Sequence, residues 1–258
     1  MDQKSRRLEH AAADHEIASE KVASKVKAAS YRPAQPTGLT ASLQCQPKAA
    51  NGVPIVVEAC LRYLKASGTD CKGVFRNPGN QRRVDQMWEH MKNHPYARLS
   101  ANSISQFMSQ KEEFSAYEVS SFLKRFVNSM EDTEPVITYM CYGPLVELVH
   151  TKCADHLIGI KYKAIIRQLL IAPHRILLAR LCNFLLDFSQ YEHKTDMDCT
   201  ALAICFGFLI RSPPEPATSR KHKMRKKDRV KLVLAEAAKA KANAVVIENL
   251  ITHANRIF

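Results

Sequence analysis

Apolar side chains recur every three or four residues through most of the chain after residue 38, which is the spacing of one face of an α-helix. The segments with this pattern are 54–66, 81–92, a stretch opening at 115, 139–149, 173–188, 197–209 and 235–258. No stretch alternates apolar and polar positions with a period of two over a convincing length. The sequence therefore predicts an all-α fold in which the helices pack into a single multi-helix domain.

The first 37 residues differ in character from the rest of the chain. They are rich in Ala, Lys and Glu, and their large apolar side chains form only a thin stripe. Pro33 and Pro36 end this tract. We therefore predict that residues 1–37 form an N-terminal extension, either a marginal helix or a disordered arm, and that residues 38–258 form the helical domain.

Two polar residues mark the start of the most strongly periodic segment. Ser115 and Glu118 have the spacing of a capping box, in which each side chain bonds to the backbone N–H of the other residue. Val119, Phe122 and Phe126 then follow on one face. This pattern predicts a helix that begins directly after Ser115 and buries that face.

A short segment between the first two predicted helices carries an arginine in an unusual setting. Residues 73–80 read GVFRNPGN, and Pro78 with Gly79 marks a tight turn. Asn80 is a good N-cap for the helix that follows. Arg76 is therefore expected on a short, stiff loop at a helix end, where its planar and permanently charged fork suits a phosphate or carboxylate group. The local sequence also fits a surface arginine beside a turn.

The positive charge of the chain is concentrated in one run. The 258 residues carry a formal net charge of +13, from 38 Lys and Arg against 25 Asp and Glu. Residues 220–231 hold eight basic residues and one acidic residue, which leaves +7. We predict a basic loop at about 218–231 and hypothesise that it binds an anionic membrane surface; a solvated, flexible loop is the alternative. The candidate membrane-binding residues are Lys221, Lys223, Arg225, Lys226 and Lys227.

Several common chemistries lack their sequence signatures. The phosphate loop GxxxxGK[ST], the dinucleotide motif GxGxxG, the metalloprotease motif HExxH and the nucleophile motif GxSxG are all absent. The eight cysteines form no CxxC pair, so no metal site is expected. No homeodomain, zinc-finger or leucine-zipper pattern accompanies the basic run, so nucleic acid is not an expected partner. The sequence has no long apolar run and no secretory leader, which predicts a cytoplasmic protein.

Several motifs resemble those of the Rho-type GTPase-activating domain family, known as RhoGAP. Residues 55–64 resemble the first core helix of the family, and residues 246–258 resemble its terminal helix. GVFRNPG at 73–79 resembles the family motif G-[IL]-[FY]-R-x-[SP]-G, and LAICFG at 202–207 resembles L-A-x-V-F-G. FLKRF at 122–126, together with Glu134 and Pro135, resembles L-K-x-F-L-R…P-E-P. Each motif alone is weak, but their order and spacing over residues 38–258 are specific. The resemblance implies a RhoGAP-like helical domain.

The resemblance also implies a role for the loop that carries Arg76. In a RhoGAP domain Arg76 would be an arginine finger that enters the active site of a Rho-family small GTPase and stimulates GTP hydrolysis in trans. Lys124 would support the finger loop and contact the partner. The residues implied in the geometry of that loop are Gly73, Phe75, Pro78 and Gly79. The GTPase would carry GTP and Mg²⁺, so this chain is expected to need no cofactor of its own and to hydrolyse no nucleotide itself.

Three expected GTPase-contact positions depart from the family pattern. Asn128 stands where the family has an arginine, Ala201 where it has an asparagine, and Phe208 where it has a proline. Each lost polar contact would remove about 0.5 to 1.5 kcal/mol of binding free energy, or up to about 3 kcal/mol if it is charged. The departures support an alternative hypothesis: a RhoGAP-fold interaction module that binds a GTPase or another signalling protein with weak or no activation. Under either hypothesis, the chain would lie at the inner membrane surface if the basic loop binds lipid.

Overall fold

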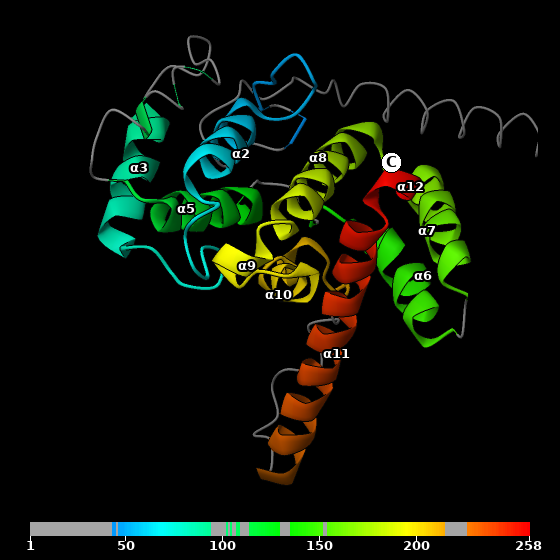
Figure 1. The fold of residues 1–258 in the computed structure, drawn as a ribbon. Coiled ribbons are helices and arrows are strands. Elements are labelled where there is room, and N and C mark those ends of the chain that lie inside the picture. Colours follow the sequence, from blue (N-terminus) through cyan, green and yellow to red (C-terminus); the bar gives the residue numbers. More distant parts are fainter. Residues whose placement is uncertain are drawn as a thin grey trace, which may run out of the picture. The chain divides into compact units, whose positions relative to one another are not determined.

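The structure is a computed structural model that describes residues 43–44, 46–93, 102, 104, 107–108, 114–129, 135–151, 154–214 and 226–258. Its helices are α2 (Ile55–Ser67), α3 (Gln81–Asn93), α5 (Ala116–Ser129), α6 (Tyr139–His150), α7 (Asp155–Leu169), α8 (Ala172–Ser189), α9 (Glu192–Thr195), α10 (Cys199–Cys205), the 3₁₀ turn η2 (Gly207–Leu209), α11 (Lys226–Thr252) and α12 (Ala254–Ile257) (Figure 1). The described ranges contain no β-strand, only isolated bridges from Lys48 to Pro54 and from Ile137 to Ile210. The all-α prediction is confirmed. The predicted extension, residues 1–37, lies outside the described residues.

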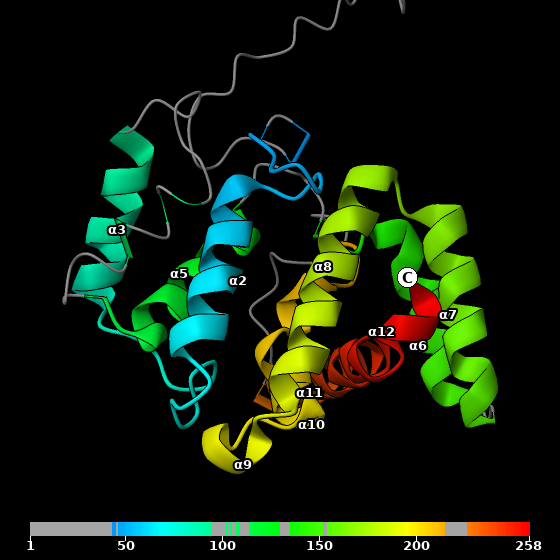
Figure 2. The same ribbon diagram turned by 45° about the horizontal axis from the view of Figure 1, so that its top comes forward.

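Helix α8 lies between two groups of helices (Figures 1 and 2). On one side, α5 packs against α2 and α3. On the other side, α6 packs against α7, and α12 packs against both α7 and α8. Helix α11 runs alongside α10 and also contacts α6 and α8. The periodicity of α5 explains its place, because the side chains of Val119, Phe122, Leu123 and Phe126 share one face and are fully buried.

The predicted helix boundaries agree with the structure at most positions. Helices α2, α3, α6 and α8 begin and end within one residue of the predicted limits. The predicted segment 197–209 is divided into α10 and η2, with Phe206 between them. The last helix begins at Lys226 instead of 235, so the predicted basic loop is wrong for residues 226–231, which are helical. The remainder of that loop, residues 218–225, lies outside the described part of the chain.

Helix α7 was not predicted, although its sequence carries a helical pattern. Ile158, Tyr162, Ile166 and Leu169 are spaced by three or four residues, and the side chains of Tyr162 and Ile166 are about 1% exposed. The Asn249 side-chain amide of α11 donates to the Tyr162 hydroxyl over 3.1 Å. This hydrogen bond links α7 to α11.

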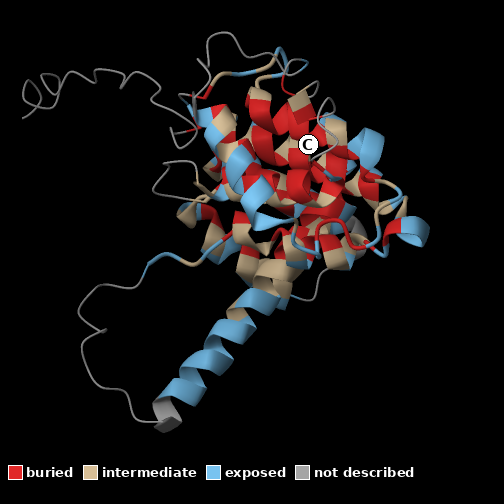
Figure 3. Cartoon of the chain, turned by 90° about the vertical axis from the view of Figure 1, so that its left-hand side faces the viewer, coloured by how far each residue is buried: buried red, intermediate tan, exposed pale blue. Residues whose placement is uncertain are grey.

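Helix α11 is divided into an exposed half and a buried half (Figure 3). Val246, Ile247, Leu250 and Ile251 near its end are fully buried, whereas residues 229–238 are exposed throughout. Within the described chain, no helix combines the length and the apolar character that crossing a membrane requires.

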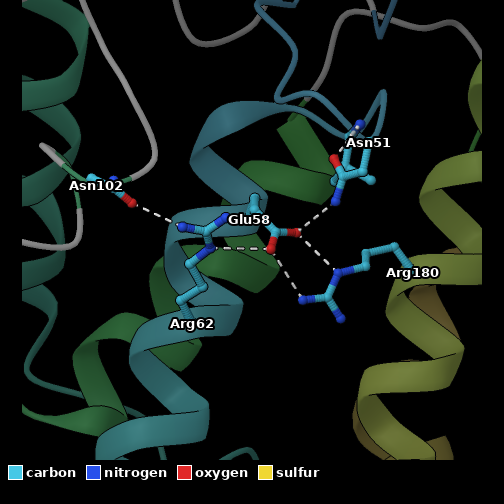
Figure 4. A network of polar contacts seen from close by, with 6 residues as sticks. Asn51, Glu58, Arg62, Asn102 and Arg180 are labelled. Carbon is cyan, nitrogen blue, oxygen red and sulfur yellow. Dashed lines mark hydrogen bonds and ion pairs between the residues drawn. The ribbon is translucent and has the colours of Figure 1, made fainter.

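A buried carboxylate joins α2 to α8 (Figure 4). Glu58 on α2 is 5% exposed, and its oxygens accept two hydrogen bonds from Arg180 on α8, at 2.9 and 3.2 Å. Asn51 and Arg62 donate to the same carboxylate at 3.1 and 3.2 Å. Burial raises the pKa of Glu58, but the hydrogen bonds and the charge of Arg180 outweigh it and hold the pKa below its ordinary value of 4.5.

Replacing Arg180 tests this link. Arg180→Met is expected to lower the free energy of unfolding by about 2 kcal/mol, because it leaves a buried carboxylate with fewer charged donors. The matched variant Arg62→Met should cost about 0.5 kcal/mol, since the Arg62 side chain is 51% exposed. Urea unfolding of both variants measures the difference.

The difference in unfolding free energy between the wild type and Arg180→Met is expected to depend on pH. A lowered folded-state pKa contributes stability above the ordinary pKa of 4.5, and this stability is lost as the pH falls through the folded-state pKa. The gap in unfolding free energy between the wild type and Arg180→Met should therefore narrow below pH 4.5. A gap that stays constant from pH 7 down to about pH 3 would show that the ion pair is not its source.

Candidate functional site

One face of α5 holds the loop that precedes α3. Tyr117, Ser120, Ser121 and Lys124 are spaced by three or four residues, so their side chains lie on the same face. The Tyr117 hydroxyl donates to the carbonyl of Lys72 over 2.9 Å, and the Ser120 hydroxyl donates to the carbonyl of Val74 over 2.6 Å. Lys124 Nζ donates to the carbonyl of Phe75 over 2.6 Å, and Ser121 Oγ accepts from the Gly79 N–H over 2.9 Å. The helix thus contacts the loop backbone from residue 72 to residue 79.

Glu118 adds a link at the end of this loop. Its carboxylate is 5% exposed and accepts from the backbone N–H of Asn80 over 2.9 Å and from that of Ser115 over 2.7 Å. The Glu118 half of the predicted capping box is therefore present, whereas the Ser115 hydroxyl accepts from the Tyr117 N–H over 3.3 Å and not from that of Glu118. Glu118 also reaches the start of α3. Burial raises the pKa of Glu118, but the bonds from Ser115 and Asn80 outweigh it and lower that pKa below 4.5. Asn80 Oδ1 accepts from the N–H groups of Arg82 and Arg83, which confirms the predicted N-cap.

Two glycines allow the loop to take this path. Gly73 has a φ of +67°, a region that favours glycine, and its carbonyl accepts from the N–H groups of Arg76 and Asn77 at 2.9 and 2.8 Å. The Gly73 N–H donates to the carbonyl of Thr195 over 2.6 Å, which ties the loop to α9. Gly79 lies against the backbone of α5, where a Cβ atom would be 2.5 Å from the Glu118 nitrogen. Only glycine fits that position without movement of the helix.

Phe75 anchors the loop in the core. Its side chain is fully buried, and its ring meets the rings of Phe188, Phe206 and Phe184 edge to face at 5.1, 5.3 and 6.4 Å between centroids. Arg76, the next residue, is exposed. The loop therefore turns one side chain into the core and the next one toward the surface.

Three titratable groups come together beside this loop. Burial lowers the pKa of Lys124 below its ordinary value of 10.5. Burial raises the pKa of the Cys205 thiol on α10, and the positive charges of Lys124 and Arg76 oppose that rise. Lys124 donates to the carbonyl that directly precedes Arg76, and the Phe75 ring meets that of Phe206, the residue after α10, so Lys124, the Arg76 loop and the end of α10 are neighbours.

The remaining predicted contact residues lie on α5 and around α10. Asn128, one turn after Lys124, is exposed, and its side-chain oxygen accepts a hydrogen bond from the guanidinium of Arg211. Ala201 lies in the first turn of α10, and its N–H donates to the Asp198 side chain over 2.6 Å. Phe208 lines a groove of about 690 Å³ between α10 and α11.

The predicted membrane-binding residues are not part of this site as described. Lys221, Lys223 and Arg225 lie outside the described residues. Lys226 and Lys227 are the first residues of α11, and their side chains are likewise not described. Their membrane role stays a prediction.

Comparison with known proteins identifies the family. The model of the RhoGAP domain matches residues 54–215, which is more than half of the chain. This chain belongs to the RhoGAP domain family. The match includes the Arg76 loop, α5 and α10.

Individual RhoGAP relatives are distant in sequence. The chain is 25% identical over 163 residues to the GTPase-activating protein pac-1 of Caenorhabditis elegans, covering 63% of this chain and 10% of the relative. It is 27% identical over 166 residues to human Rho GTPase-activating protein 4, covering 63% and 16%, and 29% identical over 194 residues to mouse Rho GTPase-activating protein 23, covering 74% and 12%. The chain thus spans between a tenth and a sixth of the length of these relatives.

Solved RhoGAP structures share the fold. The crystal structure of human Rho GTPase activating protein 15 superposes with a TM-score of 0.64 at 18% identity, over 87% of this chain and 92% of that chain. The BH domain of GRAF, the GTPase regulator associated with focal adhesion kinase, superposes with a TM-score of 0.60 at 17% identity, over 81% and 96%. These similarities confirm the predicted RhoGAP-like fold.

Several residues that shape the site were not predicted. Tyr117, Ser120 and Ser121 form a polar stripe at helical spacing beside the apolar face of α5, and this spacing could have been recognised in the sequence. The contact between Arg211 and Asn128 had no such signal, because the two residues are far apart in the sequence. The same holds for the bond from Gly73 to the Thr195 carbonyl.

The close approach of Gly79 to α5 can be tested by adding one methyl group. Gly79→Ala is expected to lower the free energy of unfolding by about 2 kcal/mol, because backbone atoms must shift to admit the Cβ. Gly143→Ala on α6 is the control, since a Cβ there meets nothing within 4 Å, and it should add up to about 1 kcal/mol of stability. Thermal or urea unfolding compares the two; equal stability of both variants would rule out the close packing of loop and helix.

Proposed function

We propose that this chain is a GTPase-activating protein for a Rho-family small GTPase and that Arg76 is its arginine finger. The main support is a loop whose backbone is held at several points while its arginine is exposed. Membership of the RhoGAP family supports the choice of partner class.

The chemistry of the partner explains why such a loop is useful. Negative charge is spread over the equatorial oxygens of the transferring γ-phosphoryl group, and a guanidinium can donate several hydrogen bonds to oxygens of this kind. A finger supplied in trans raises the hydrolysis rate by about 10³- to 10⁵-fold. The gain depends on donors that are already in position, since a mobile arginine would have to be ordered during the reaction. The hydrogen bonds from Ser120 and Lys124 to the backbone beside Arg76 supply this order before the partner binds.

Lys124 has a positioning role in this proposal. Its Nζ donates to the Phe75 carbonyl, one residue before the finger, and its side chain is only partly exposed. The GTPase and its nucleotide supply GTP and Mg²⁺, and this chain contributes no group that binds nucleotide by itself.

The second candidate function is an interaction module that binds a GTPase without activating it. The absence of family side chains at Asn128 and Ala201 favours it. Arg211 argues in the other direction, because its guanidinium reaches Asn128, the position where the family carries an arginine. We therefore infer that Arg211 returns a positive charge to this part of the partner-binding face.

Replacing Arg76 tests the finger. In single-turnover GTP hydrolysis with Rho, Rac and Cdc42 proteins, Arg76→Ala should reduce the stimulated rate by about 10³-fold. Arg76→Lys should recover little of it, since an ammonium keeps the charge but lacks the planar fork. The control Arg82→Ala removes an exposed arginine from α3 and should leave the rate unchanged.

The outcomes separate the two candidate functions. Stimulation by the wild type that Arg76→Ala abolishes supports the activating function. If the wild type stimulates no GTPase but binds one in its GTP-loaded form, the chain is an interaction module and the finger proposal fails.

Replacing Arg211 tests the inferred compensation. Arg211→Ala should raise the KM for the GTPase about tenfold and leave kcat nearly unchanged, because a charged hydrogen bond to the partner is lost in ground state and transition state alike. Arg167→Ala removes an exposed arginine from α7 and serves as the control. A fall in kcat at constant KM would instead show that Arg211 acts together with Arg76 in the transition state.

A further inference from the structure

One half of α11 is exposed (Figure 3), and it includes several large aliphatic residues. Val230, Val233 and Leu234 are 54%, 66% and 64% exposed, and Leu232 is 47% exposed. Four neighbouring aliphatic residues with this exposure are unusual on the helix of a soluble domain and mark a surface for interaction.

Most of these side chains share one face. Val230, Val233, Leu234 and Ala237 are spaced by three or four residues and form one stripe, whereas Leu232 points to another side of the helix. We call these four residues the α11 stripe. The same face continues toward the C-terminus as Ala244 and Val245, which line the groove beside Phe208. The exposed Lys241 lies on this face between the α11 stripe and Ala244.

Basic residues border the α11 stripe. Arg229 and Lys231 flank Val230 in the sequence, and both are exposed. The nearest acidic side chain of known position, Glu236, pairs with Lys239 over 2.9 Å. The stripe also begins within the run 220–231, which carries a net charge of +7. An apolar stripe with cations along its edges is the pattern of a helix that lies in the interface of an anionic bilayer.

We propose that the α11 stripe binds the surface of an anionic membrane. In this arrangement the aliphatic side chains enter the boundary between headgroups and acyl chains, and Arg229 and Lys231 contact anionic headgroups. The proposal concerns a surface that the finger loop does not use, so it holds whether or not the chain activates a GTPase.

The distribution of charge favours a membrane over a second copy of the chain. Two copies paired along the stripe with their helices in the same direction would bring Arg229 and Lys231 close to the same residues of the other copy, and like charges in contact oppose association. Nucleic acid would engage the cations but would leave the aliphatic side chains exposed to water. An anionic bilayer can both bury the aliphatic side chains and pair with the cations.

Vesicle sedimentation of the 258-residue chain tests the proposal. The vesicles contain phosphatidylcholine alone or phosphatidylcholine with about a third phosphatidylserine, and strong binding is expected only to the second kind. Val230→Gln with Leu234→Gln should weaken that binding by at least about tenfold, because the buried aliphatic area is lost. Arg229→Gln with Lys231→Gln should weaken it by about 25-fold at low salt, roughly fivefold for each charge.

Two controls match these variants. Leu232→Gln removes an aliphatic side chain of similar exposure from another side of the same helix and should change binding less than twofold. Arg82→Gln with Arg83→Gln removes the same net charge from α3 and should also have a small effect. Circular dichroism and thermal unfolding should be the same for all variants, since these side chains support no described core contact.

Several results would overturn the proposal. Equal binding to both kinds of vesicle, or equal losses for Leu232→Gln and the stripe variant, would exclude the α11 stripe as an anionic-membrane surface. A dimer in analytical ultracentrifugation that the stripe variant dissociates would identify a second copy as the occupant. A lower affinity of the stripe variant for a soluble GTPase without membranes would assign the stripe to that partner.

Discussion

The bond from Lys124 Nζ to the Phe75 carbonyl is the contact on which the geometry of the loop depends. Phe75 is buried, and a buried carbonyl needs a donor. Because α5 supplies that donor, together with the one for Val74, the loop needs no regular structure of its own. The arginine that follows is thus exposed on a backbone that is already hydrogen-bonded. Helix α5 fixes the position of the loop backbone, and the loop supplies the positively charged side chain of Arg76.

The sequence predicted those features that depend on neighbouring residues. The limits of α2, α3, α6 and α8, the bond from the Ser115 N–H to Glu118 and the N-cap at Asn80 each follow from local spacing, and the structure confirms them. The links from Gly73 to Thr195 and from Asn128 to Arg211 could not be predicted, because they join segments that only the tertiary fold brings together. The basic run misled the prediction in another way. Charge was taken as a sign of a loop, although Lys and Arg are good helix formers and α11 includes the end of that run.

The departure at Asn128 shows a limit of comparing motifs position by position. The sequence pattern records the loss of an arginine from α5. In the structure the guanidinium of Arg211, which follows η2, donates to the Asn128 side chain, so a positive charge lies beside this position. A function carried by a charge depends on where the charge lies and not on which segment supplies it. Ala201 itself has no polar side-chain group, and its backbone N–H donates to the Asp198 cap.

The hydrogen bond from the Gly73 N–H to the Thr195 carbonyl matters for the design of peptides that mimic the loop. A synthetic peptide containing residues 73–79 would lack α5 and α9, and with them the donors and the acceptor that fix its backbone. Such a peptide would have to lose its conformational freedom on binding, at a cost of about 1 to 2 kcal/mol for each residue ordered. The arginine is therefore not a portable motif. A mimic would have to reproduce the scaffold around it.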